Sequence, residues 1–219
     1  IVMDTLDEVR RRVKIDPDRT YIGGFSGGGR IAMTIATALP EYFGGVIPVC
    51  AGGRLRTELW LRERVMSRLR FALLTGENDF NRGEIERMTQ TLFSGIGVTS
   101  RVWTAKRIGH AIPSGKTLDE AFAWLEDGLK DRQALARRFP ASRISDAPSR
   151  SEWARQLFAE AELRLESEEL FYSGLTQLMG IRVRWNDLPE SDKALVILKK
   201  LDAADDRPWE AVDVASHGR

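Results

Sequence analysis

The chain has 219 residues, of which 42% are hydrophobic, and its 33 Lys and Arg side chains almost balance its 32 Asp and Glu side chains. The formal net charge of +1 gives no bulk electrostatic attraction for nucleic acid or an anionic membrane surface, so we expect neither as a partner. The longest apolar runs fall short of the roughly 18 to 20 residues that cross a membrane, so we expect no membrane span.

The amino-terminal segment does not resemble a leader sequence. The chain begins at Ile1 rather than Met, and residues 5–13 have the pattern of the middle of an amphipathic helix. We therefore expect the natural amino terminus to be missing. A signal peptide would lie in that part, so the sequence does not assign a compartment.

Strand-like and helix-like segments alternate through the first 136 residues. Apolar runs predict strands at Arg19–Phe25, Gly45–Ala51, Phe71–Thr75 and Thr99–Ala105. Periodic apolar positions predict helices at Gly28–Leu39, Glu58–Leu69 and Gly83–Ser94, and one long helix from about Leu118 to Ala136. Because the strands read as continuous apolar runs between helices, the sequence predicts an α/β fold with a parallel sheet covered by helices on both faces.

The carboxyl-terminal third has a different pattern. Residues 137–150 combine proline and serine without periodicity, which indicates a linker between an α/β domain at 1–136 and a helical extension at 151–219. The extension contains three apolar stripes, centred on Ala154 to Ala161, Phe171 to Met179 and Ala194 to Leu201. They fit a helical appendage, or a single tetratricopeptide-like unit that could bind a protein partner, followed by a loosely held tail.

A glycine-rich turn follows the first predicted strand. Gly24-Phe25-Ser26-Gly27-Gly28 matches G-x-S-x-G at the junction of a strand and a helix, which is the context that a nucleophile elbow requires. We expect Gly24 and Gly28 to relieve steric crowding in the turn, so that the Ser26 hydroxyl stands clear of the backbone. The Gly27 N–H at the start of the helix would donate to an oxyanion. The alternative is a serine that only caps the helix.

The same glycines could instead cradle a phosphate. The run "GGFSGGGR" contains neither G-x-x-x-x-G-K-[ST] nor G-x-G-x-x-G, so a P-loop or dinucleotide site is disfavoured. Cys50 is the single cysteine, which excludes an internal disulfide and a multi-cysteine metal site. Its position in an apolar run favours a buried, unreactive thiol.

A nucleophilic serine needs a base, and the chain has two histidines. His217 lies in the polar tail, whereas His110 follows the fourth predicted strand, where open parallel sheets place their ligands. The acid should follow another strand, and "TGENDF" offers Asp79 and Glu77 after the third one. We favour Asp79, because its position further beyond the strand end lets its carboxylate turn toward the loop of His110.

The order Ser26, Asp79, His110, with each residue after a strand, resembles the α/β-hydrolase superfamily over about residues 5–136. The segments "GFSGGGR", "TGENDF" and "GHAIP" are most similar to bacterial esterases of the polyhydroxyalkanoate depolymerase and feruloyl esterase kind. This resemblance implies that Ser26 attacks an ester carbonyl, that His110 transfers the proton, and that Asp79 orients His110. It implies a small-molecule or polymeric ester as substrate, and no metal or organic cofactor.

The resemblance is incomplete at its amino-terminal side. Such hydrolases carry strands before the nucleophile strand, and a loop from that region supplies the second oxyanion donor. We therefore expect this chain to be the carboxyl-terminal part of a larger hydrolase, with the apolar edge of its first strand uncovered. Two other hypotheses stay open: a non-catalytic scaffold whose helical extension binds a partner, and a serine peptidase or acyltransferase on the same fold.

Overall fold

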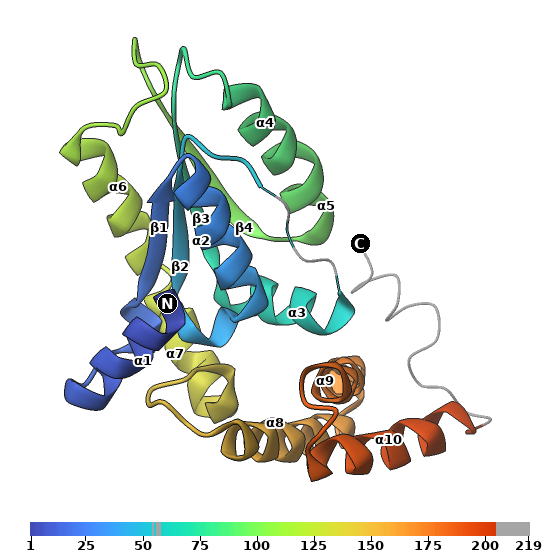
Figure 1. The fold of residues 1–219 in the computed structure, drawn as a ribbon. Helices are drawn as coiled ribbons and strands as arrows, with labels where there is room; N and C mark the ends of the chain where they lie inside the picture. The colour runs from blue at the N-terminus through green and yellow to red at the C-terminus, as the bar shows by residue number, and fades with distance from the viewer. Residues whose placement is uncertain (54, 56–57, 205–219) are drawn as a thin grey trace.

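The computed structural model describes residues 1–53, 55 and 58–204 of the chain. Figure 1 shows a sheet with helices on both sides and a group of three helices, α8 to α10, at one end of it. The tail that we expected to be loosely held, with His217, lies outside the described residues.

The sheet confirms the predicted parallel α/β class. Its strands are β1 (Tyr21–Phe25), β2 (Gly45–Val49), β3 (Arg70–Gly76) and β4 (Thr99–Ala105), in the spatial order β1-β2-β3-β4. All three neighbouring pairs are parallel, with Tyr21 opposite Gly45 and Arg70 opposite Thr99. The carboxyl ends of the four strands therefore lie at one edge of the sheet, where the loops that follow them can meet.

Successive residues of the two central strands point to opposite faces, and different helices cover them. On one face, Val46 and Phe71 belong to a buried cluster that includes residues of α2 (Gly27–Ala38) and α3 (Leu59–Arg68). On the other face, Ile47 and Ala72 pack with residues of α6 (Gly115–Glu126). Because both faces are covered, the central strands read in the sequence as apolar runs rather than as alternating patterns.

The remaining helices around the sheet follow the predictions with one error. The helical region after β3 consists of α4 (Arg82–Arg87), a π-helical stretch (Met88–Phe93) and α5 (Ser94–Ile96). The prediction of one long helix at 118–136 is wrong, because α6 ends at Glu126 and α7 (Leu129–Arg138) begins after Gly128. Glycine is a poor helix former, and the break allows Arg132 in α7 to donate to the Asp18 carbonyl at 2.9 Å.

The three helices predicted at the carboxyl-terminal side are present. They are α8 (Arg150–Leu165), α9 (Phe171–Arg184) and α10 (Pro189–Asp202), and α1 (Val2–Arg12) lies at the other end of the chain. Figure 1 places α8 to α10 at the end of the sheet opposite the β1–α2 turn. The helix α9 packs closely on α3, since a Cβ atom at Gly180 would lie 2.8 Å from the Trp60 ring.

The helical group and the sheet share buried contacts. The indole of Trp153 in α8 packs edge-on against Trp185 at 5.3 Å and against Tyr42 at 6.0 Å between ring centroids. Within the segment that we interpreted as a linker, Phe139 and Ile144 are buried. The division into domains at 1–136 and 151–219 stays a prediction, as does the tetratricopeptide-like character of the extension.

The edge of the sheet and the length of the helices test two further expectations. In the described sheet β1 is an edge strand that pairs with β2 alone, as the expectation of an uncovered edge requires. The described residues contain no helix that is both long enough and apolar enough to cross a membrane.

Candidate active site

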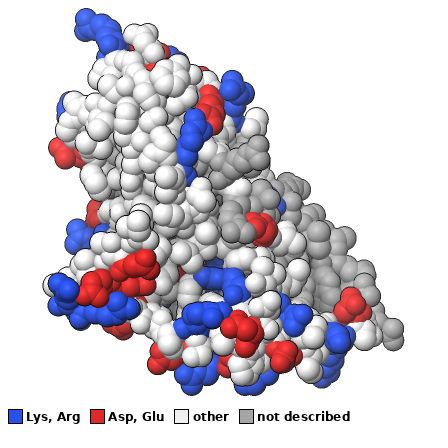
Figure 2. Space-filling view, in the orientation of Figure 1, with Lys and Arg blue, Asp and Glu red and all other residues white. Residues whose placement is uncertain are grey.

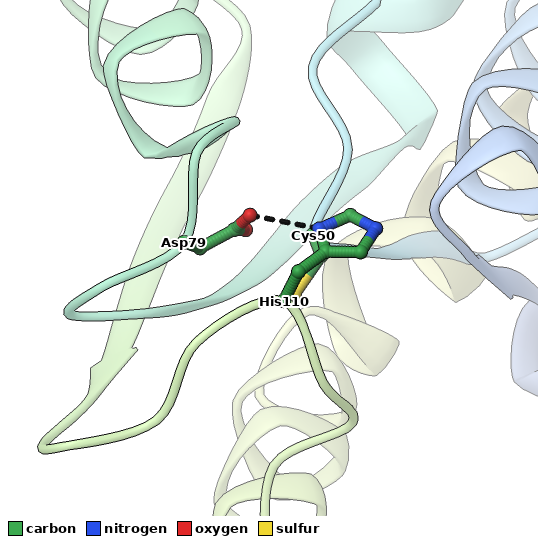
Figure 3. Close-up of side chains that lie close together, drawn as sticks. All are labelled: Cys50, Asp79 and His110. Carbon is green, nitrogen blue, oxygen red and sulfur yellow. Dashed lines mark hydrogen bonds and ion pairs between the residues drawn. The ribbon is translucent and has the colours of Figure 1, made fainter.

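Loops after three of the parallel strands bring Ser26, Asp79 and His110 together. Ser26 directly follows β1, Asp79 lies three residues past the end of β3, and His110 lies in the loop between β4 and α6. All three are therefore at the carboxyl-terminal edge of the sheet. Figure 3 shows Asp79 and His110 pointing toward each other from their separate loops, with Cys50 beneath the imidazole.

Ser26 has a strained backbone. Its φ of 51° and ψ of −119° lie in a region that residues with a side chain rarely adopt. The conformation is held on both sides: the Ser26 N–H donates to the Val49 carbonyl at 2.8 Å, and its carbonyl accepts from the N–H of Gly29 at 2.9 Å. Strain that the surrounding structure maintains at a strand-to-helix turn is what the G-x-S-x-G motif predicts.

The glycines of the turn differ in how much room they need. A Cβ atom at Gly24 would lie 2.5 Å from the Gly28 carbonyl oxygen, so the expected role of Gly24 agrees with the structure. The expectation for Gly28 is wrong, because a Cβ atom there would meet no atom within 4 Å. The second crowded position is Gly29, where a Cβ atom would lie 2.8 Å from the Gly24 carbonyl oxygen and from Ala51 Cβ. The crowding arises where the first turn of α2 crosses the end of β1.

A chain of hydrogen bonds links the three side chains. Nε2 of His110 lies 2.9 Å from Oγ of Ser26, and Nδ1 of His110 lies 2.8 Å from Oδ1 of Asp79. An ionised Asp79 can only accept, so the proton of a neutral imidazole is on Nδ1 and Nε2 is left to accept the Ser26 hydroxyl proton. Asp79 is buried, whereas the His110 side chain is 20% exposed and can reach a substrate.

The surroundings of Asp79 keep it ionised. Burial raises the pKa of its carboxyl group, but hydrogen bonds from the Asn81 N–H, His110, the Thr75 hydroxyl and the Cys50 thiol outweigh burial and lower the pKa to about 2. The Thr75 hydroxyl donates to Oδ2 at 2.8 Å and the Asn81 N–H donates to Oδ1 at 3.0 Å. Asp79 is thus ionised next to His110 at neutral pH.

Glu77, the other carboxylate that we considered, lies elsewhere. Its Oε2 accepts from the backbone N–H of Arg107 at 2.9 Å, and it joins the loop after β3 to the loop after β4. The structure therefore pairs Asp79, and not Glu77, with His110.

Cys50 is buried below this pair, as expected. Its Sγ also lies 3.3 Å from the Ala111 carbonyl oxygen, and its own carbonyl accepts from the side chain of Asn81 at 2.9 Å. Burial, together with the neighbouring Asp79 carboxylate, raises the pKa of the thiol to about 11. Cys50 thus contacts the loops of both Asp79 and His110 while remaining protonated.

Cys50, Asp79 and His110 are also residue types that bind metals, and their candidate ligand atoms lie within 4.8 Å of one another. The chemistry of the donor set does not suit a metal ion well. The Asp79 oxygen atoms already accept hydrogen bonds from Thr75, Asn81 and His110, and the thiol would have to lose a tightly held proton. We therefore interpret this cluster as a hydrogen-bond network.

Aromatic rings border His110 where it faces solvent. The ring of Phe80 stacks on the imidazole with centroids 4.2 Å apart and planes inclined by 26°. The ring of Phe25 lies at 4.9 Å with an inclination of 46°. Near the start of α2, Arg30 forms a two-point ion pair with Glu84 at 2.6 and 2.7 Å and also donates to the Gly52 carbonyl, which ties the loop after β2 to α2 and α4.

Several residues of the site were absent from the sequence prediction. Thr75 was part of a predicted strand, and nothing in a strand pattern marks a hydroxyl that will bind a carboxylate four residues later. Asn81 and Phe80 directly follow Asp79, so the only signal was their closeness to the acid. Cys50 was predicted only as a buried thiol, but it directly follows β2, the strand between β1 and β3, and so had to lie between their loops.

Comparisons with known proteins give likenesses at the level of structure. No family model matches the sequence, and no curated protein matches it significantly. Arabidopsis thaliana SOBER1 is 21% identical with a TM-score of 0.42, over 58% of this chain and 61% of that one. Staphylococcus aureus S-formylglutathione hydrolase FrmB is 13% identical with a TM-score of 0.45, over 57% of this chain and 61% of that one. Bacillus cereus carboxylesterase is 19% identical with a TM-score of 0.42, over 57% of each chain. This chain thus spans about three fifths of the length of these three proteins.

Proposed function

We propose that this chain carries the catalytic part of a serine hydrolase of the α/β-hydrolase type, which cleaves carboxylic esters through a covalent acyl-enzyme. Ser26 is the nucleophile, His110 is the general base and acid, and Asp79 orients His110 and stabilises its protonated form. The observation that carries this proposal is the continuous hydrogen-bond chain from Ser26 through His110 to Asp79, with distances of 2.9 and 2.8 Å.

In the first half of the reaction, Oγ of Ser26 attacks the ester carbonyl carbon while Nε2 of His110 takes the hydroxyl proton. The carbonyl oxygen becomes an oxyanion, and the N–H of Gly27, one of the unpaired donors in the first turn of α2, donates to it. The protonated His110 then gives its proton to the alcohol oxygen. The bond from carbon to that oxygen breaks, the alcohol leaves, and the acyl group stays on Ser26.

In the second half, a water molecule takes the place of the alcohol. His110 accepts a proton from the water as its oxygen attacks the acyl carbon, and it returns that proton to Oγ of Ser26 as the acid leaves. Asp79 holds the imidazole in the tautomer that both halves need, since its pKa of about 2 keeps it a hydrogen-bond acceptor.

The oxyanion site affects which assay is suitable. We assign one donor, the Gly27 N–H, and loss of one donor typically lowers kcat about 100-fold to 1000-fold. Turnover therefore depends on the oxyanion donors as well as on the three side chains. A covalent probe that needs a single attack by Ser26 is a more sensitive readout than repeated turnover.

The proposal is tested with a fluorophosphonate that carries a fluorescent reporter. We expect stoichiometric labelling of the wild-type chain and none of Ser26→Ala. Ser67→Ala, which removes an exposed serine on α3 away from the site, is the matched control and should label like the wild type. Labelling that survives in Ser26→Ala, or a wild-type chain that is folded but never labelled, would contradict the proposal.

The two hydrogen bonds of the triad favour this proposal over a non-catalytic scaffold, which gives no reason for them to form. Binding of a protein partner to the helical extension stays a prediction. A serine peptidase or an acyltransferase would use the same three residues, and the choice between water and another acyl acceptor depends on the residues around the acyl group.

A further inference from the structure

The position of Phe80 has no explanation in the packing of the protein. Its side chain is 76% exposed, so it contributes little to the hydrophobic core, yet its ring is stacked on the imidazole of His110 at 4.2 Å. Phe25, which is 37% exposed, approaches the same imidazole at 4.9 Å. Two exposed aromatic rings thus border the residue that we propose as the base.

The backbone on both sides of Phe80 is fixed by hydrogen bonds. The Asp79 N–H donates to the Gly76 carbonyl at 3.1 Å, and the Asn81 N–H donates to Oδ1 of Asp79 at 3.0 Å. The Asn81 side chain in turn donates to the Cys50 carbonyl at 2.9 Å. Phe80 is therefore presented beside His110 by the same network that holds the acid, and not by a loose loop.

The proposed mechanism defines which part of a substrate would meet this surface. His110 must deliver its proton to the alcohol oxygen, so the alcohol part of the ester lies next to the imidazole during bond cleavage. A ring stacked on that imidazole also lies next to the alcohol part. The two exposed rings make the surface beside the imidazole apolar. Figure 2 shows mainly uncharged surface over β1, with charged side chains at the tip beyond it, near α4, and over α1 and the helices at the far end.

We propose that Phe80, together with Phe25, forms an apolar platform for the alcohol part of the substrate, so that the enzyme prefers esters of apolar and above all aromatic alcohols. This inference rests on the proposed hydrolase function. Contact between aromatic rings adds about 0.5 to 1.5 kcal/mol beyond the burial of apolar surface, which corresponds to a preference of about twofold to twelvefold.

The test compares benzyl acetate with methyl acetate. The two esters form the same acetyl-enzyme and have leaving alcohols of similar acidity, so the ratio of their kcat/KM values reports contacts to the alcohol part. We expect this ratio to fall about twofold to twelvefold in Phe80→Ala and to be retained in Phe80→Tyr, which keeps the ring. Phe122→Ala removes an exposed ring that packs on Tyr21 at the opposite end of β1, and should keep the wild-type ratio.

A second measurement does not require turnover. Benzyl alcohol should slow fluorophosphonate labelling of the wild-type chain more than methanol does, and Phe80→Ala should lose most of this protection. The inference would be overturned if Phe80→Ala left both the kcat/KM ratio of the two esters and the protection by benzyl alcohol unchanged. It would also be overturned if kcat/KM fell equally for the two esters. If the wild-type chain does label but shows no preference, only this inference fails; if it never labels, the proposed function fails and the inference fails with it.

Discussion

Replacing Asp79 by Asn tests the role of the triad acid with almost no change in shape. The amide can donate a hydrogen to Nδ1 of His110, which now lies 2.8 Å from Oδ1. The proton of the neutral imidazole would then be on Nε2. A protonated Nε2 cannot accept the hydroxyl proton of Ser26. A change of tautomer of this kind in a Ser-His-Asp triad lowers kcat about 10⁴-fold. We expect a similar loss in the rate of fluorophosphonate labelling of Ser26.

The same variant has an expected effect on stability, with a defined sign. The pKa of Asp79 is lowered from 3.8 to about 2 in the folded chain, which corresponds to roughly 2 kcal/mol of stabilisation. Because the folded pKa is the lower one, this stabilisation is present above about pH 4 and disappears as the pH falls toward 2. Urea unfolding at pH 7 should therefore show Asp79→Asn to be less stable than the wild type, with the difference shrinking toward pH 2.

The two readouts separate catalysis from folding. If Asp79→Asn labels within tenfold of the wild-type rate, Asp79 does not control the tautomer of His110 and the reasoning is refuted. If the difference in unfolding free energy is the same at pH 7 and near pH 2, the ionised carboxylate does not contribute the stabilisation that we assign to its hydrogen bonds.

Two further predictions concern the turn and the thiol. Gly24→Ala should lower the free energy of unfolding by more than about 2 kcal/mol, because its Cβ would clash with the Gly28 carbonyl. Gly28→Ala, in the open first turn of α2, should change it by less than about 1 kcal/mol. Comparable urea midpoints for the two variants would disprove this account of the crowding. Cys50 is buried and the pKa of its thiol is raised to about 11, so iodoacetamide at pH 8 should leave it unmodified in the folded chain and alkylate it in urea. Rapid alkylation of the folded chain, measured by intact mass, would show that the thiol is exposed or ionised.

Sequence patterns predicted the sheet well because buried parallel strands leave a direct signature. The buried strands Gly45–Val49 and Arg70–Gly76 are mainly apolar runs, and the structure reproduces both within two residues of the predicted bounds. The candidate site followed from the same logic, because residues just beyond the ends of parallel strands must share one edge. Asp79 and Glu77 shared that edge, and only the course of the loop after β3 separated them.

The sequence was less informative where the outcome depended on contacts between distant segments. The break between α6 and α7 is small in the sequence, but in the structure it places Arg132 against Asp18. The crowding at Gly29 rather than Gly28 depends on how α2 crosses β1 and Ala51. The stacking of Phe80 on His110 joins loops from two strands, so no local pattern could indicate it.

The most direct test of the central claim is to map the fluorophosphonate adduct by mass spectrometry and to measure its rate of formation in the wild type and in His110→Ala. The account predicts a single adduct on Ser26 whose formation slows by several orders of magnitude without the imidazole. An adduct on another residue, or a Ser26 adduct that forms at the same rate in His110→Ala, would contradict it.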